Sequence, residues 1–136
     1  MNVNPYLFFN GECEAAFKFY EQCLGAKIEA MMRHAGTPAE KHTPPERLNS
    51  IMHASMKIGD TVLMGSDAPP ELYHKPQGFA VTIVLRDTPK AERVFHALAE
   101  GGEVRMAIQK TFWAERFGML VDKFGIPWMI NCGEPS

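Results

Sequence analysis

The stretch DAPPELYHKPQG, residues 67–78, divides the sequence into two halves, and the likeness of these halves decides the fold. Its three prolines and closing glycine are typical of a connection. Apolar periodicity before it predicts a strand, a helix and three strands, at residues 3–10, 11–24, 27–34, 49–58 and 61–66. The same order follows it, at residues 79–85, 88–100, 103–110, 117–123 and 126–132. We therefore expect one domain, 1–136, built of two βαβββ modules at about 1–67 and 78–136, with a linker at 68–77.

The first helix carries capping signals at both ends. Asn10 is the expected N-cap, Gly25 is the expected residue after the last turn, and Glu12 and Glu14 suit the positive end of the helix dipole. The predicted apolar stripe consists of Ala15, Ala16, Phe19, Tyr20, Cys23 and Leu24. Residues 35–48 contain Gly36 and three prolines, which predicts an irregular flap or excursion.

A constant offset between the halves supports duplication of one module. Shifting the sequence by 76 residues brings together Phe19 with Phe95, Gly25 with Gly101, and Ile28 with Val104. A module with a single helix leaves one face of its sheet uncovered, so we expect the two bare faces to close a cup within one chain or to pair between two chains. A cup between sheets is a natural site for a small ligand.

Composition and charge narrow the classes of partner. The chain has 136 residues, 46% of them hydrophobic and 22% charged, with a net charge of -2 and no basic run. This pattern predicts no nucleic-acid and no membrane partner, and leaves a small molecule or another protein chain. No apolar stretch reaches the roughly 20 residues of a membrane span and no signal peptide is recognisable, so we expect a cytoplasmic protein. Three cysteines in no metal-binding spacing predict reduced thiols.

Several stretches resemble one known family. They are YLFFNG at 6–11, Phe19-Tyr20, Gly25, MHA at 52–54, LMGSD at 63–67, and a closing run of Trp113, FGM at 117–119, Asp122, Phe124-Gly125 and WMI at 128–130. Together they resemble the PhnB-like family of the vicinal oxygen chelate superfamily, which includes glyoxalase I, bleomycin resistance proteins and extradiol dioxygenases. The resemblance implies an α+β, glyoxalase-like fold in which two βαβββ modules form a curved, cup-like mixed sheet with helices on the outside. It also implies a homodimer.

The resemblance locates the positions at which metal-using relatives carry a His, Glu or Gln ligand. Here they fall at Pro5, Met64, Phe79 or Val81, and Met129. None of these side chains offers the imidazole or carboxylate that a divalent ion of this class requires, and a thioether is a soft, weak donor. Shifting the positions by one residue adds oxygen atoms only from Asn4 and Tyr6. We therefore expect no metal and no other cofactor.

Strand parity predicts which side chains line the cup instead. A hairpin turning at Gly59-Asp60 places Met64 opposite Ser55 and Ser66 opposite His53. A hairpin turning at Phe124-Gly125 places Met129 opposite Leu120 and Asn131 opposite Gly118. Trp113 precedes the seventh strand, where it could stack on a ligand, cover the cup or fill a dimer interface. The predicted ligand-binding residues are Leu7, His53, Ser55, Met64, Ser66, Phe79, Val81, Trp113, Leu120, Met129 and Asn131.

His53 is the single candidate for catalysis, because histidine exchanges protons near neutral pH. The alternative is a hydrogen-bonded structural role. Three functions compete: a metal-independent protein that binds a small, partly apolar organic molecule, a metal-dependent or His-assisted enzyme of the glyoxalase or dioxygenase type, and a ubiquinone-pathway methyltransferase suggested by an older family label. The third is disfavoured, since no glycine-rich turn leads from a strand into a helix.

Overall fold

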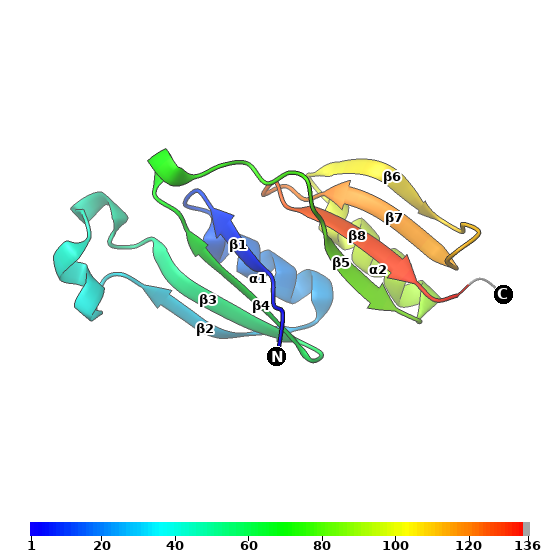
Figure 1. Cartoon of the computed structure of the whole chain (residues 1–136), viewed down its shortest axis with the longest axis horizontal. Coiled ribbons are helices and arrows are strands. Elements are labelled where there is room, and N and C mark those ends of the chain that lie inside the picture. The colour runs from blue at the N-terminus through cyan, green and yellow to red at the C-terminus, as the bar shows by residue number, and fades with distance from the viewer. Residues whose placement is uncertain (135–136) are drawn as a thin grey trace. The chain divides into compact units, whose positions relative to one another are not determined.

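The computed structural model describes residues 1–134 and contains two successive βαβββ repeats (Figure 1). The first comprises β1 (Tyr6–Phe9), α1 (Cys13–Leu24), β2 (Lys27–Arg33), β3 (Ile51–Ile58) and β4 (Thr61–Asp67). The second comprises β5 (Val81–Leu85), α2 (Thr88–Ala99), β6 (Glu103–Gln109), β7 (Arg116–Val121) and β8 (Pro127–Cys132). Three short 3-10 helices, η1 (Pro38–His42), η2 (Pro45–Arg47) and η3 (Pro70–Leu72), lie in the connections. The predicted α+β class with two βαβββ modules is confirmed.

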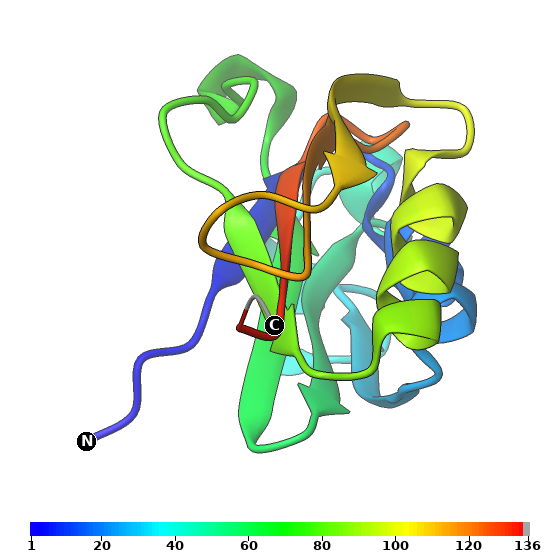
Figure 2. The same cartoon turned by 90° about the vertical axis from the view of Figure 1, so that its right-hand side faces the viewer.

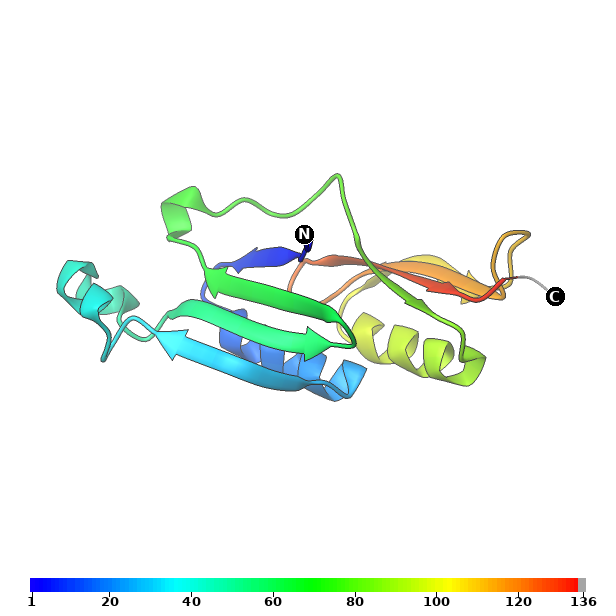
Figure 3. The same cartoon turned by 60° about the horizontal axis from the view of Figure 1, so that its bottom comes forward.

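Each repeat folds into its own four-stranded mixed sheet. The strand orders are β1-β4-β3-β2 and β5-β8-β7-β6, with β1 parallel to β4, β5 parallel to β8, and the other neighbours antiparallel. One helix lies on one face of each sheet, as Figures 2 and 3 show. The chain forms two compact units, Met1–His74 and a second that begins at Lys75. The duplication seen in the sequence is therefore a duplication of complete sheet-and-helix units.

The core of the first unit lies between α1 and its sheet. Cys13, Ala16, Phe17 and Tyr20 are buried on α1, at the spacing of three and four residues that places side chains on one helix face. Gly65 on β4 lets the Phe17 ring approach closely, since a Cβ atom there would lie 2.8 Å from Phe17 Cε1. The predicted stripe was therefore wrong in its rotation: Ala15 is exposed and Phe19 is half-buried.

The start of α1 also corrects a prediction. Asn10 does not cap the helix, which begins at Cys13 after Glu12, and the Glu12 side chain forms no capping hydrogen bond. The Cys13 N–H instead donates to Asp67 Oδ1 at 2.9 Å, and the other carboxylate oxygen of Asp67 accepts from the Ile51 N–H at 2.9 Å. A buried carboxylate at the end of β4 thus satisfies a free N–H at the helix start, as a local cap would.

In the second unit, too, the core lies between the helix and its sheet, and the connection that follows the helix is longer. Ala91, Val94, Phe95 and Leu98 are buried on α2, and a Cβ atom on Gly118 would lie 2.6 Å from Phe95 Cε2. The first residues of α1 and α2 differ by 75 positions, whereas the first residues of β2 and β6 differ by 76. The predicted offset of 76 thus holds for the strands that follow the helices, whereas the helix starts differ by 75, because the connection after α2 is one residue longer than the connection after α1.

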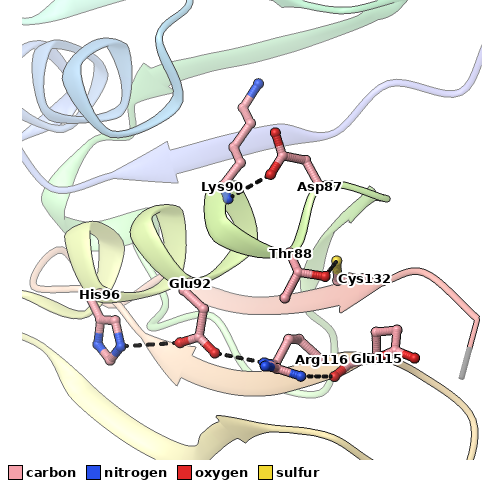
Figure 4. A network of polar contacts seen from close by, with 8 residues as sticks. All are labelled: Asp87, Thr88, Lys90, Glu92, His96, Glu115, Arg116 and Cys132. Carbon is pink, nitrogen blue, oxygen red and sulfur yellow. Dashed lines mark hydrogen bonds and ion pairs between the residues drawn. The ribbon is translucent and has the colours of Figure 1, made fainter. Parts of the chain in front are cut away.

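Polar contacts fasten α2 to its sheet (Figure 4). Glu92 accepts from Arg116 Nε on β7 at 2.8 Å and lies 3.5 Å from His96 Nε2. The Thr88 hydroxyl, at the start of the helix, lies 3.9 Å from the Cys132 sulfur at the end of β8. In the first unit a glutamate of α1 also contacts an arginine of the sheet, but on the edge strand: Glu14 lies 2.6 Å from Arg33 on β2.

Residues 35–48 form a closed loop between β2 and β3. The Ala35 N–H donates to the Leu48 carbonyl at 2.9 Å across the base of the loop, and η1 and η2 lie within it. Arg47 donates to the Asp67 carbonyl at 3.1 Å. The predicted irregular excursion thus contains two short 3-10 turns. Within residues 1–134, no helix has the length and apolar character needed to cross a membrane.

Candidate functional site

The face of the first sheet that points away from α1 carries most of the predicted polar residues. Leu7, Phe9, Ala54, Met56 and Leu63 are buried and point toward α1, so the residues that alternate with them point the other way. We call these residues the first open face. They are Tyr6, Phe8, Lys27, Ala30, Met32, His53, Ser55, Lys57, Val62, Met64 and Ser66.

Strand register orders the first open face into three rows. The central row runs across all four strands as Tyr6, Met64, Ser55 and Ala30. One flanking row contains Phe8 paired with Ser66, and His53 paired with Met32. The other contains Val62, Lys57 and Lys27. The face is therefore apolar along β1 and polar along β3, with a basic end at the β3–β4 turn.

A hydrogen bond between Tyr6 and His53 crosses this face. Tyr6 Oη lies 3.2 Å from His53 Nδ1, and the two rings are 5.8 Å apart at an interplanar angle of 34°. The Phe8 ring lies 5.1 Å from Tyr6, and Phe8 is 54% exposed. His53 Nε2 has no hydrogen-bond partner among residues 1–134. An imidazole nitrogen thus remains free to contact a ligand that stacks on the neighbouring aromatic rings.

The first unit brings together four of the predicted site residues and separates a fifth. His53, Ser55, Met64 and Ser66 lie on the side of the sheet that points away from α1, as the hairpin at Gly59-Asp60 predicted, although Ser66 is only 8% exposed. Leu7 lies on the other face, 2% exposed and packed toward α1, so its predicted place beside them was wrong. Leu7 pairs with Gly65 in the parallel register of β1 and β4, and this register was not fixed by any local signal.

Sequence reasoning missed the two aromatic side chains of β1. Tyr6 and Phe8 alternate with Leu7, so assigning Leu7 to the open face removed them from the predicted site. The polarity of Tyr6 was the available signal, since a buried position under a helix seldom carries a phenol without a partner. Met32, 42% exposed, was missed as well because its pairing with His53 follows an irregularity in the β2–β3 register.

The corresponding face of the second sheet is mainly apolar, and we call it the second open face. Its central row is Thr82, Met129, Met119 and Met106, and a flanking row contains Val84, Asn131, Phe117 and Gln109. Met129 and Asn131 therefore occupy the predicted kind of position. Trp113 packs against Phe117, with ring centroids 5.3 Å apart, and Phe79 precedes β5 and is 53% exposed.

The β7–β8 turn explains two differences from prediction. Val121 pairs with Pro127, the Asp122 N–H donates to the Ile126 carbonyl, and Gly125 has φ 89°. A three-residue loop with glycine in the left-handed region replaces the expected two-residue turn. Met129 consequently pairs with Met119, and the predicted pairing with Leu120 was wrong. Leu120 and Val81 both pair with Trp128, so they lie on the α2 side of the sheet.

The positions expected to hold a divalent metal do not fit one. Met64 and Met129 present thioethers, Val81 points toward α2, and the Pro5 carbonyl already accepts from the Met64 N–H at 3.0 Å. In the part of the chain that the structure describes, no three His, Cys, Asp or Glu side chains are grouped so that they could hold a metal ion. The donor chemistry at these positions is therefore that of an organic-ligand surface.

The Cys13 thiol does not provide a nucleophile. Burial, and then the nearby carboxylates of Asp67 and Glu14, raise its pKa far above the ordinary value for cysteine. A thiol held in its protonated form in the core is chemically inert at neutral pH.

Comparisons with known proteins agree with this fold. A family model described as 3-demethylubiquinone-9 3-methyltransferase matches residues 1–131. The protein YjdN of Escherichia coli is 35% identical over 139 residues, covering 96% of this chain and 95% of YjdN. The crystal structure of protein PA1353 from Pseudomonas aeruginosa is 41% identical, covers 99% of both chains and superposes with a TM-score of 0.90. A putative methyltransferase of that name from Bacillus cereus, called PhnB protein, has 21% identity, covers 98% of this chain and all of its own, and shares the fold with a TM-score of 0.79.

Proposed function

The chain belongs to the PhnB-like family of the vicinal oxygen chelate superfamily, and from this premise we propose that it binds a small, partly apolar organic molecule on the first open face without a divalent metal. The observation that carries the proposal is the hydrogen-bonded pair of Tyr6 and His53 beside the exposed ring of Phe8. A few polar groups set in an apolar surface are what orient a small ligand.

The metal-free part of the proposal follows from donor chemistry. Divalent ions of the superfamily's usual kind need imidazole nitrogen or carboxylate oxygen, and the corresponding positions carry proline, methionine and valine or phenylalanine. Elemental analysis of protein purified without chelators should find less than about a tenth of an equivalent of Ni, Zn, Fe or Mn per chain. One equivalent of such a metal, lost when the neighbours of Met64 and Met129 are changed, would contradict this part.

An enzyme that uses His53 is the second candidate, and the free Nε2 atom favours it. A histidine held through Nδ1 by a tyrosine hydroxyl has its other nitrogen available for proton transfer to or from a bound molecule. A binding protein returns its ligand unchanged, whereas an enzyme converts it. Mass spectrometry of a bound molecule before and after incubation separates the two.

The methyltransferase activity named by the family description finds no support in the turns that would hold a nucleoside cofactor. The β1–α1 connection contains one glycine, Gly11, and the β5–α2 connection, Arg86-Asp87, contains none. Binding of such a cofactor at a strand-to-helix turn requires a glycine-rich loop that lets the backbone approach the phosphates or sugar.

Ligand binding can be tested with phenylnaphthylamine, a neutral apolar dye whose fluorescence rises in an apolar site. We expect saturable binding to the wild-type chain, weakened about tenfold in Phe8→Ala and in His53→Ala. His96→Ala is the matched control, because His96 is an exposed imidazole on α2 of the second unit. A His53→Ala chain that is severely destabilised yet binds the dye with unchanged affinity would identify His53 as structural, and absence of saturable binding would refute the proposal.

We also propose that the chain forms a homodimer. Each unit covers one face of its sheet with a helix and leaves the other to be covered, and Phe112, in the connection after β6, is 88% exposed. An obligate dimer would bury upwards of about 2,000 Å² with aromatic contacts at its centre. Sedimentation equilibrium should give twice the chain mass of 15.2 kDa, and a mass of one chain at micromolar concentration would contradict the dimer.

A further inference from the structure

Two lysines face each other at one end of the first open face. Lys27 on β2 is the direct cross-strand partner of Lys57 on β3, and both side chains are exposed. Like charges at directly opposed positions of an antiparallel pair are destabilising. Neither ammonium group has an ion-pair partner within residues 1–134. The pair therefore places two positive charges side by side on the sheet surface, with no carboxylate of the described residues within 4 Å of either ammonium group.

Protection of a sheet edge does not account for this pair. Lysine on an edge strand discourages pairing with another chain, and β2 is an edge strand, so Lys27 alone could serve that purpose. Lys57 lies on β3, which has β2 on one side and β4 on the other. A second lysine at an interior position, opposite the first, adds repulsion without adding protection.

The lysines continue the surface assigned above to the ligand. Lys57 is four residues beyond His53 on β3, so the two side chains share a face with their Cα atoms about 13 Å apart. Ser55 lies between them, in the row that contains Met64 and Tyr6. Because a lysine side chain extends several ångströms from its Cα atom, a molecule of two or three rings can contact His53 and an ammonium group together.

We infer that the molecule bound on the first open face is an organic anion, with its apolar body over Tyr6, Phe8 and Met64 and its acidic group over Lys27 and Lys57. This inference rests on the proposed function and names the chemical class of its ligand. Lysine ammonium groups are compact point charges that bind a carboxylate, sulfonate, phosphonate or phosphate without a fixed geometry. The shared requirement is one acidic group at the end of an apolar body.

A matched pair of dyes tests the inference. Anilinonaphthalenesulfonate has the skeleton of phenylnaphthylamine with one added sulfonate, so the ratio of the two affinities isolates the effect of the negative charge. We expect the wild-type chain to bind the sulfonate at least about tenfold more tightly at low salt, and the preference to shrink as ionic strength rises toward about 0.2 M. Inorganic phosphate alone should compete weakly, because it lacks the apolar body.

The double variant Lys27→Gln and Lys57→Gln should lose this preference while binding the neutral dye as the wild type does. Lys27→Arg with Lys57→Arg should keep it, since the charges remain. The matched control is Lys41→Gln with Lys90→Gln, which removes two exposed lysines from η1 and α2 and should leave the preference intact.

The outcomes separate this inference from the proposed function. Failure of the wild-type chain to bind the neutral dye refutes the proposed function, whatever the sulfonate does. Binding of the neutral dye with no preference for the sulfonate, or a preference that survives in the double Gln variant or is lost equally in the control, overturns the anion assignment alone. A double Gln variant that unfolds at a lower urea concentration than the wild type would contradict the repulsion between the two lysines.

Discussion

The two open faces occupy equivalent positions in the two units but have different chemistry. The central row of the first is Tyr6, Met64, Ser55 and Ala30, and the central row of the second is Thr82, Met129, Met119 and Met106. The first offers hydrogen-bonding groups and positive charge beside aromatic rings. The second offers flexible, polarizable thioethers, which adapt to many apolar shapes.

The helix sides of the two sheets differ less in chemistry, because both are apolar and packed against a helix. Each unit has a glycine under a helix ring, but on strands that do not correspond: Gly65 is on β4 under Phe17, and Gly118 is on β7 under Phe95. A close-packed interior tolerates few side-chain shapes, whereas a face turned away from the helix is limited only by what it contacts. The contrast shows which side of a duplicated βαβββ unit is free to acquire a function.

The largest expected losses of stability follow from removing one buried carboxylate in each unit. Asp67 accepts the N–H groups of Cys13 and Ile51, and Asp122 accepts those of Phe124, Ile126 and the Trp128 indole. Replacing either aspartate by alanine should lower the free energy of unfolding by about 3 kcal/mol, because buried donors lose their acceptor.

Urea unfolding can assign each loss to its unit. Both tryptophans, Trp113 and Trp128, lie in the second unit, so their fluorescence reports that unit, while circular dichroism reports both. If the units unfold separately, Asp67→Ala will shift the dichroism transition and leave the fluorescence midpoint unchanged, and Asp122→Ala will shift the fluorescence midpoint. A loss below about 0.5 kcal/mol in either variant would contradict the proposed importance of the carboxylates.

A smaller loss of stability is expected when the two glycines that face the helices are replaced by alanine. A Cβ atom at residue 65 would lie 2.8 Å from Phe17 Cε1, and one at residue 118 would lie 2.6 Å from Phe95 Cε2 and 2.9 Å from its Cδ2. Gly65→Ala and Gly118→Ala should each cost about 1–3 kcal/mol, with the larger loss at Gly118.

Trimming the opposing ring supplies the control for these variants. Combining Gly118→Ala with Phe95→Leu, and Gly65→Ala with Phe17→Leu, should give double variants more stable than the sum of the single losses predicts. Strict additivity in both thermodynamic cycles would show that the loss of stability does not come from contact between the new methyl group and the ring.

The smallest loss of stability is expected when the ion pair that joins each helix to its sheet is removed. The side-chain hydrogen bond from Arg33, and then that from Lys18, lowers the pKa of Glu14 below its usual 4.5. A lowered pKa stabilises the fold above pH 4.5, and this contribution disappears as the pH falls through the lowered value. Because Glu14 and its partners are substantially exposed, Glu14→Gln should cost less than about 1 kcal/mol at neutral pH and nothing at low pH.

Glu92→Gln in the second unit is the paired measurement, since Glu92 contacts Arg116 at 2.8 Å and His96 at 3.5 Å. Its loss at neutral pH should be of the same order. A loss above about 2 kcal/mol for either glutamate at neutral pH would mean that the helix depends on its ion pair more than surface electrostatics allows.

The sequence allowed the order of elements, the two modules and the first hairpin to be predicted, because their signals are local. Turn residues such as Gly59-Asp60 act within a few positions, and so do apolar alternations along a strand. The rotation of α1 and the face of Leu7 depend on pairings with residues more than fifty positions away. The β7–β8 register depends on a three-residue turn closed in part by the Asp122 side chain, which accepts from the Phe124 and Ile126 N–H groups.

The candidate site also contains residues placed by local signals and residues placed by distant strand pairing. The hairpin placed His53 with Ser55, Met64 and Ser66, whereas the Tyr6 partner of His53 required the parallel register between β1 and β4. Parallel pairing joins strands through a long crossover, and no residue pattern near Tyr6 specifies it. The pairing of Lys27 with Lys57 could likewise not be predicted, because it depends on the register between β2 and β3.

The position of Asp67 also sets the order in which the first unit can fold. Its carboxylate joins the start of α1, 54 residues earlier, to the start of β3, 16 residues earlier. The first turn of α1 therefore lacks its acceptor until the last strand of the unit has arrived, and the β1–β4 pairing waits for the same segment. On the ribosome, the N-terminal helix should stay only transiently formed until residue 67 has left the exit tunnel, after which the unit closes in one cooperative step.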